Sequence, residues 1–107
     1  MLSNGLLAIA LEQGLVDHDY IAQRTEGFEE LRRHLLGVDT TYVERVTGVS
    51  LDKQRRAVEL MARAPSSMLL SGRGAEQQSK GTATVLSFTN LMLALGKVGK
   101  PASGYGC

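Results

Sequence analysis

The sequence predicts a predominantly helical α/β fold, with five to six helices and one short strand of the parallel type at about residues 67–71. Most of the chain places its apolar residues at helical spacing between capping residues and glycines. In contrast, Ser67-Met-Leu-Leu-Ser71 is a continuous apolar run of strand length, as in buried parallel strands. A glycine-rich loop and an apolar helix follow this strand.

The first part of the chain predicts a helix and a capped turn. Ser3 or Asn4 is placed to cap a helix over residues 4–13, which Gly14 ends because glycine readily adopts the conformation that closes helices. Asp17 then caps a short turn that begins with acidic residues. The sequence therefore predicts two short elements before residue 25.

The next stretch predicts two helices that end at glycines. Thr25 begins a helix that ends at Gly37. Thr41 and Glu44 have the spacing of a capping box, in which each side chain satisfies one first-turn amide of a short helix that closes at Gly48.

Two longer helices are expected on either side of the strand. Ser50 opens the first, and Pro65 stops it because proline lacks an amide hydrogen and clashes with the preceding turn. Thr82 is placed to cap the last helix, over about residues 83–95. This helix is apolar almost all round, so it must be buried on more than one side.

Residues 96–107 show no periodicity and contain four of the glycines, so we expect them to leave the domain as a loop. A single strand cannot satisfy its own edges. Its partners are therefore expected outside the chain, and residues 1–107 are expected to be a fragment of a larger α/β domain.

Composition excludes several classes of function. The chain has 107 residues, enough for one domain, and its 12 Lys and Arg against 11 Asp and Glu form no basic surface for nucleic acid or an anionic membrane. The apolar N-terminal run breaks at Glu12, too early to span a bilayer, and no signal peptide is evident. The single cysteine, Cys107, allows no internal disulfide, which fits a reducing compartment such as the cytoplasm.

The strongest candidate for a binding site is the glycine loop, residues 71–82. Between a strand and a helix, glycines let the backbone approach a ligand. Gln77 stands where a dinucleotide-binding motif has its third glycine, which disfavours simple nucleotide binding. Arg73 offers a planar cationic fork and Gln77 neutral donors and acceptors, a set that suits a flat heteroatom-rich ring or a pyrophosphate. The alternative is an ordinary solvated connection.

No catalytic residue or metal ligand is predicted. His18 and His34 are far apart in the sequence, His18 in a turn beside two aspartates and His34 near a helix end, which disfavours a metal site or catalytic pair built on them. Glu29 and Glu30 occupy neighbouring helical positions, which do not face each other.

Most of the chain resembles the molybdopterin oxidoreductases, and in particular the assimilatory nitrate reductases. The stretches that carry the resemblance are Asn4–Leu7, Glu12–Asp17, Tyr20–Leu31, Val46–Val49, Ser71–Thr82 and Gly96–Cys107. Their order and spacing make the family match specific, whereas the choice of nitrate reductases depends mostly on the final Ser-Gly-Tyr-Gly-Cys.

The resemblance implies a large enzyme that holds molybdenum between two molybdopterin guanine dinucleotides, has a 4Fe-4S cluster near its N-terminus, and reduces nitrate to nitrite. This chain would be an internal fragment of the α/β domain that closes over one face of the cofactor. Carried over by position, Arg73 and Gln77 correspond to residues that touch the cofactor, and Gly72 and Gly74 give the backbone clearance. Arg73 replaces a methionine common in the related formate enzymes.

The resemblance also implies the partners: the remainder of the same catalytic chain and an electron-donor protein or subunit. The cluster cysteines and the molybdenum-binding residue would lie outside these residues, so the isolated piece is expected to bind no metal and to be inactive. Two alternatives stay open. The first is a molybdopterin oxidoreductase of the formate dehydrogenase type, which has the same fold and a different substrate. The second is a free-standing helical interaction module, which would bury its last helix in a partner or a homodimer.

Overall fold

The computed structural model describes residues 1–107, which form seven helices and two short strands. In chain order these are α1 (Leu2–Glu12), α2 (His18–Arg24), α3 (Phe28–Leu35), α4 (Thr40–Thr47), α5 (Leu51–Arg63), β1 (Met68–Leu70), α6 (Arg73–Glu76), α7 (Gly81–Ala94) and β2 (Gly104–Gly106). The predicted class, mostly helical with a short parallel strand, is confirmed, and the additional helices are short ones.

Several predicted helix boundaries are confirmed by their capping contacts. The Asp17 side chain accepts a hydrogen bond from the amide of Tyr20, and Ser50 accepts one from Lys53. Gly48 ends α4 in the left-handed conformation, at φ 73°. These caps are local, which is why the sequence alone locates them.

Other predicted caps are wrong. Thr25 ends α2, and α3 begins after Gly27 instead. Asp39, and not Thr41, caps α4, because its carboxylate accepts from the amides of Thr41 and Tyr42. Glu44 reaches out of α4 and accepts a hydrogen bond from the Leu51 amide at the start of α5.

The first and last helices also begin without the caps that the sequence predicts. Met1 precedes α1, and Ser3 lies inside this helix, where its buried hydroxyl is 2.6 Å from that of Ser87 in α7. The last helix begins at Gly81 after Lys80, without a cap from Thr82. The Ser3 to Ser87 contact joins residues 84 positions apart, so no local pattern predicts it.

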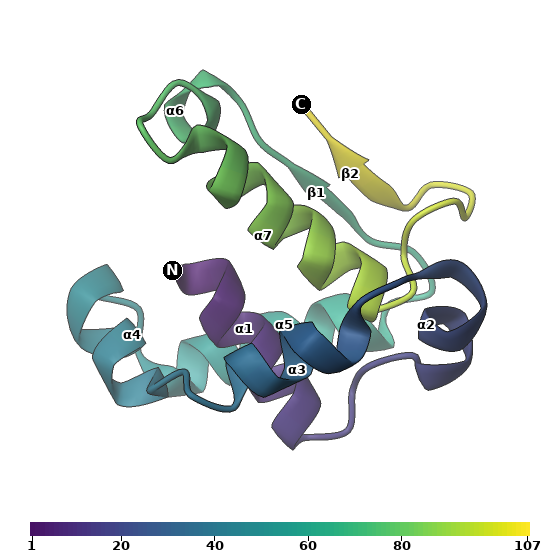
Figure 1. The fold of residues 1–107 in the computed structure, drawn as a ribbon, viewed down its shortest axis with the longest axis horizontal. Helices are drawn as coiled ribbons and strands as arrows, with labels where there is room; N and C mark the ends of the chain where they lie inside the picture. The colour runs from purple at the N-terminus through teal and green to yellow at the C-terminus, as the bar shows by residue number, and fades with distance from the viewer.

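The hydrophobic core is built around α1, which contacts α3, α4, α5 and α7 (Figure 1). Leu7 of α1, Val58 of α5 and Leu91 of α7 are completely buried at its centre. The apolar α7 contacts α1, α2, α6 and β2, as expected of a helix buried on several sides, although Leu86 remains 55% exposed.

The strand predicted from the apolar run has its partner within the chain, contrary to expectation. β1 pairs in parallel with β2, and Met68, Leu69 and Leu70 stand opposite Gly104, Tyr105 and Gly106. Part of the segment expected to be a loop is therefore a strand. Its two glycines carry no side-chain alternation, so periodicity cannot reveal it.

Helix α7 lies along the strand pair and covers one face of it (Figure 1). Tyr105 belongs to this face, and its ring is 6.4 Å from that of Phe88 in α7. Successive strand residues face opposite sides. Met68 and Leu70 therefore share the other face, where they are 56% and 72% exposed.

Candidate functional site

The glycine loop begins where β1 ends, and β2 ends beside it. Because the strands are parallel, their carboxyl ends meet at one edge, and Figure 1 shows α6 and the C-terminus at this same end of the molecule. Ligands of α/β domains bind outside the carboxyl ends of the strands. The fold therefore places the loop where such a domain carries its site.

The four predicted site residues lie together in and beside α6, a single helical turn that the sequence did not predict. Gly72 precedes α6, Arg73 and Gly74 form its start, and Gln77 ends it. All four residues are exposed. The side chains of Arg73 and Gln77 have no hydrogen-bond or ion-pair partner in the chain, so their donors and acceptors are available to a ligand.

The glycines of the loop have different roles. Gly72 has φ −154°, an extended conformation that any residue adopts, and a Cβ at Gly72 or Gly74 would meet no atom within 4 Å. Neither glycine is required by the packing of this chain. A Cβ at Gly81 would instead collide with the carbonyl oxygen of Glu76, so Gly81 is required for the loop to close.

Three polar side chains behind the loop were missed by the sequence analysis. The Ser71 hydroxyl donates a hydrogen bond to a Glu76 carboxylate oxygen at 3.2 Å and lies 2.5 Å from the Tyr105 hydroxyl. Ser71 and Tyr105 are 34 positions apart. Only the parallel pairing of β1 and β2 brings them together, so no sequence spacing indicates this contact.

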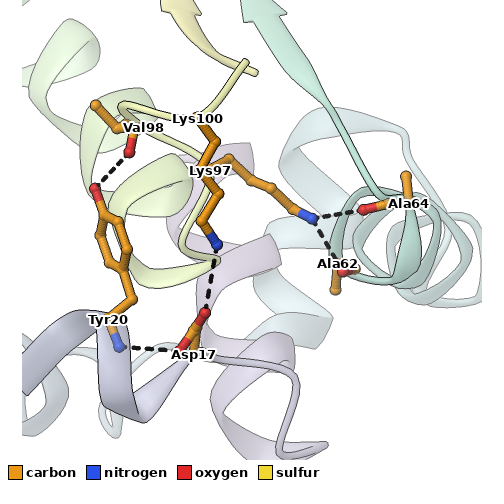
Figure 2. A network of polar contacts seen from close by, with 7 residues as sticks. All are labelled: Asp17, Tyr20, Ala62, Ala64, Lys97, Val98 and Lys100. Atoms are coloured by element: carbon orange, nitrogen blue, oxygen red, sulfur yellow. Dashed lines mark hydrogen bonds and ion pairs between the residues drawn. The ribbon is translucent and has the colours of Figure 1, made fainter. Parts of the chain in front are cut away.

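Two side chains of the α2 region hold the segment that leads into β2 (Figure 2). Tyr20 donates a hydrogen bond from its hydroxyl to the Val98 carbonyl at 2.9 Å. The Lys100 ammonium is 3.8 Å from a carboxylate oxygen of Asp17, the residue that caps α2. These contacts attach the start of the segment to the helical half of the molecule.

Lys97 attaches the same segment to the end of α5. Its ammonium donates hydrogen bonds to the carbonyl oxygens of Ala62, at 3.2 Å, and Ala64, at 2.7 Å (Figure 2). The residue is only 7% exposed. Burial lowers the pKa of Lys97 below its usual value of 10.5, the charge of Lys100 lowers it further, and that of Asp17 opposes the shift.

Two depressions bear on the choice of site. A shallow one beside the loop, of about 320 Å³, includes Glu76, Gly81, Tyr105 and Cys107 in its lining. The largest, about 800 Å³, lies between α2 and α3 and contains none of the predicted residues. It is open, and its charged groups belong to exposed helix positions such as Glu30. The loop thus remains the better candidate.

The structure gives the two histidines no shared site. His18 packs edge-on against the Phe28 ring, with centroids 6.4 Å apart, and no three His, Cys, Asp or Glu side chains lie close enough to hold a metal ion. None of the helices has the length and apolar character needed to cross a bilayer.

Comparison with known proteins shows that the chain is similar to oxidoreductases over nearly its whole length. The chain is 46% identical over 105 residues to the assimilatory nitrate reductase catalytic subunit of Bacillus subtilis, which covers 98% of this chain and 15% of the relative. It is 40% identical over 103 residues to formate dehydrogenase H of Escherichia coli, or 96% of this chain and 14% of the relative.

A third relative, protein YdeP of Escherichia coli, is 34% identical over 90 residues, which cover 84% of this chain and 12% of that protein. No family model matches the chain. The chain thus spans only a small part, 15% or less, of the length of these curated relatives.

Proposed function

The chain belongs to the molybdopterin oxidoreductases, and on this basis we propose that it is the cofactor-contacting part of a longer catalytic chain that reduces nitrate to nitrite. The observation that carries the proposal is the glycine loop: Arg73 and Gln77 present unpaired side chains at the carboxyl edge of the strand pair. Gly72 and Gly74 have no side chains and open space around them, so a ligand can approach the backbone of the loop.

The residues of the loop fit a bis-molybdopterin guanine dinucleotide cofactor. The guanidinium of Arg73 has five donors in a planar fork that suits a phosphate or a ring edge, and the Gln77 amide both donates and accepts. Gly72 and Gly74 allow a flat ring system to approach the backbone. When bound, the cofactor with its molybdenum supplies the two-electron chemistry, while the loop binds and orients it.

The rest of the proposed enzyme lies beyond these residues. We propose that the remainder of the same catalytic chain supplies the molybdenum ligand and the cysteines of a 4Fe-4S cluster, and that an electron-donor protein or subunit serves the cluster. The piece of 107 residues would then be inactive alone. The single cysteine fits a reducing compartment, and we place the enzyme in the cytoplasm as part of this proposal.

The role of the loop is tested by alanine substitutions in the full-length enzyme. Arg73→Ala and Gln77→Ala should each lower the molybdenum and the releasable guanine nucleotide per chain several-fold, without changing the circular dichroism spectrum. Gln23→Ala, an exposed glutamine of α2, is the matched control and should retain full cofactor content. Full cofactor content in both loop variants would contradict the proposal.

A formate dehydrogenase-type enzyme is the second candidate, because the chain is also 40% identical to formate dehydrogenase H. The choice of nitrate depends on the higher identity, 46%, to the nitrate reductase and on the resemblance of the ending Ser103–Cys107 to the nitrate reductases. Reduction of nitrate by the purified full-length enzyme with an artificial electron donor, and no oxidation of formate, is the expected result. The reverse pattern would favour the second candidate.

The match over 98% of the chain to an oxidoreductase argues against the free-standing interaction module. Sedimentation of the isolated chain over a range of concentrations distinguishes the two ideas. A separate part of an enzyme should associate weakly or unfold easily, whereas an interaction module should form one defined species.

A further inference from the structure

Ser71, Glu76 and Tyr105 form a directed chain of hydrogen bonds, which we name the loop latch. The Ser71 hydroxyl donates to Glu76, and a serine hydroxyl has only one proton to donate. Ser71 must therefore accept from the Tyr105 hydroxyl, 2.5 Å away. The direction of both hydrogen bonds is thus set by the carboxylate at the end of the chain, because an ionised carboxylate only accepts.

The loop latch joins three separate elements at the candidate site. Ser71 directly follows β1, Tyr105 is the middle residue of β2, and Glu76 is the last residue of α6. The Ser71 amide also donates to the carbonyl of Gly106, so backbone and side chain both tie Ser71 to β2. The position of α6 is thereby linked to the position of the second strand.

Among the helices, α6 packs mainly against α7, and it needs further contacts to fix its orientation. It is a helix of four residues, too short to be stable by its own backbone hydrogen bonds. The exposed side chains of Arg73 and of Gln77, which follows α6, have no hydrogen-bond or ion-pair partner in the chain, and a Cβ at Gly74 would meet no atom within 4 Å. Besides its contacts with α7 and a hydrogen bond of 3.3 Å from the Gln78 side chain to the Gly74 carbonyl, the orientation of this turn depends on Gly81 against Glu76 and on the loop latch.

We propose that Ser71, Glu76 and Tyr105 are positioning residues, which hold the glycine loop in the orientation that presents Arg73 and Gln77 to the cofactor. The identity of the bound group rests on the proposed function. The claim that these residues position the loop does not depend on which group is bound. Tyr105 acts through Ser71 and Glu76, and β2 thereby sets the geometry of a loop that precedes it by some thirty positions.

Tyr105→Phe tests the loop latch because it removes one hydroxyl and keeps the ring against Phe88. In the cofactor-free full-length protein, trypsin cleavage after Arg73 and amide exchange at Ala75 and Gln77 should both become roughly three- to tenfold faster, the change expected when one hydrogen bond is lost. Exchange in α1 should stay unchanged, because the opening is local. Tyr20→Phe, which removes the hydroxyl bonded to Val98, is the matched control and should leave the loop rates unchanged.

Further variants separate positioning from general packing. Ser71→Ala should match Tyr105→Phe, and the double variant should open the loop no more than either alone, because both interrupt the same chain of hydrogen bonds. Glu76→Gln keeps an acceptor oxygen and should stay near the wild-type rate, whereas Glu76→Ala should match Tyr105→Phe. Unchanged loop rates in Tyr105→Phe, or an additive double variant, would overturn the proposal.

The same variants distinguish this inference from the proposed function. If Tyr105→Phe opens the loop and also lowers the bound guanine nucleotide and molybdenum of the loaded enzyme, both are supported. If the loop opens but cofactor content is the same in Tyr105→Phe, Arg73→Ala and wild type, the positioning role stands and the cofactor role of the loop fails.

Discussion

Gly96 lies directly against the side chain of Asp17: a Cβ at Gly96 would stand 2.6 Å from the carboxylate oxygen Oδ2. Gly96 has φ +69°, a conformation that favours glycine. Asp17 caps α2 and faces Lys100 at this same corner. The end of α7, the start of α2 and the connection to β2 therefore depend on one residue without a side chain.

Gly96→Ala is expected to destabilise the chain through both conformation and contact. The left-handed conformation costs about 1 to 2 kcal/mol for a residue with a Cβ, and displacement of Asp17 should add about 1 to 3 kcal/mol. Gly14→Ala is the matched control, because Gly14 has φ +68° but no atom within 4 Å of the added Cβ. Urea unfolding measures both, and equal losses would show that the contact with Asp17 contributes nothing.

Gly81→Ala should distort the glycine loop, because the new Cβ would collide with the carbonyl oxygen of Glu76. We expect a loss of about 2 kcal/mol or more in the free energy of unfolding. Gly74→Ala, in open space within α6, should instead be neutral or stabilising by up to about 1 kcal/mol. Thermal unfolding compares the two variants, and a neutral Gly81→Ala would mean that the loop closes differently.

Leu91→Ala should cost roughly 2 to 5 kcal/mol of unfolding free energy, because Leu91 is completely buried in the core. Leu86→Ala, on the exposed part of the same helix, is the control and should cost less than about 1 kcal/mol in the isolated chain. Chemical denaturation gives both values. A near-neutral Leu91→Ala would show that α7 is not packed against α1 in solution.

Lys97 should make the stability of the chain depend on pH in the alkaline range. Its pKa is lowered in the folded chain, chiefly by burial, below the usual 10.5 that it regains on unfolding. Between these two values the unfolded chain holds more protons, so the contribution of Lys97 to the unfolding free energy rises with pH. The full contribution is present above the pKa that Lys97 has in the unfolded chain. It is lost as the pH falls through the lower pKa that Lys97 has in the folded chain.

Lys97→Met measures this effect, because it removes the titrating group and keeps most of the apolar stem. The unfolding free energy of the wild type minus that of Lys97→Met should increase from neutral pH towards about 10.5. Lys53→Met, an exposed position on α5, is the control, and its difference from the wild type should stay flat. A flat difference for Lys97→Met as well would contradict the lowered pKa.

The predictable parts of this fold are those with local causes. Asp17 and Ser50 cap their helices through contacts three residues away, and β1 is recognised from its apolar run. The four predicted site residues likewise lie within one short stretch, from Gly72 to Gln77, and the structure places them together on one exposed turn. The predicted cap at Thr41 is wrong because Asp39, two residues earlier, accepts from the amides of Thr41 and Tyr42 and starts the helix before Thr41, and two candidate caps this close cannot be ranked by spacing alone.

The sequence by itself determined the helical class, the β1 strand and the loop that carries Arg73 and Gln77, because caps, periodicity and glycine placement act within a few residues. Only the tertiary structure decided that β2 pairs with β1, that Lys97 is bound to the end of α5, and that Tyr105 reaches Ser71. These contacts join residues more than thirty positions apart. Their formation depends on the packing of α7 and the parallel pairing of the strands, which no local pattern specifies.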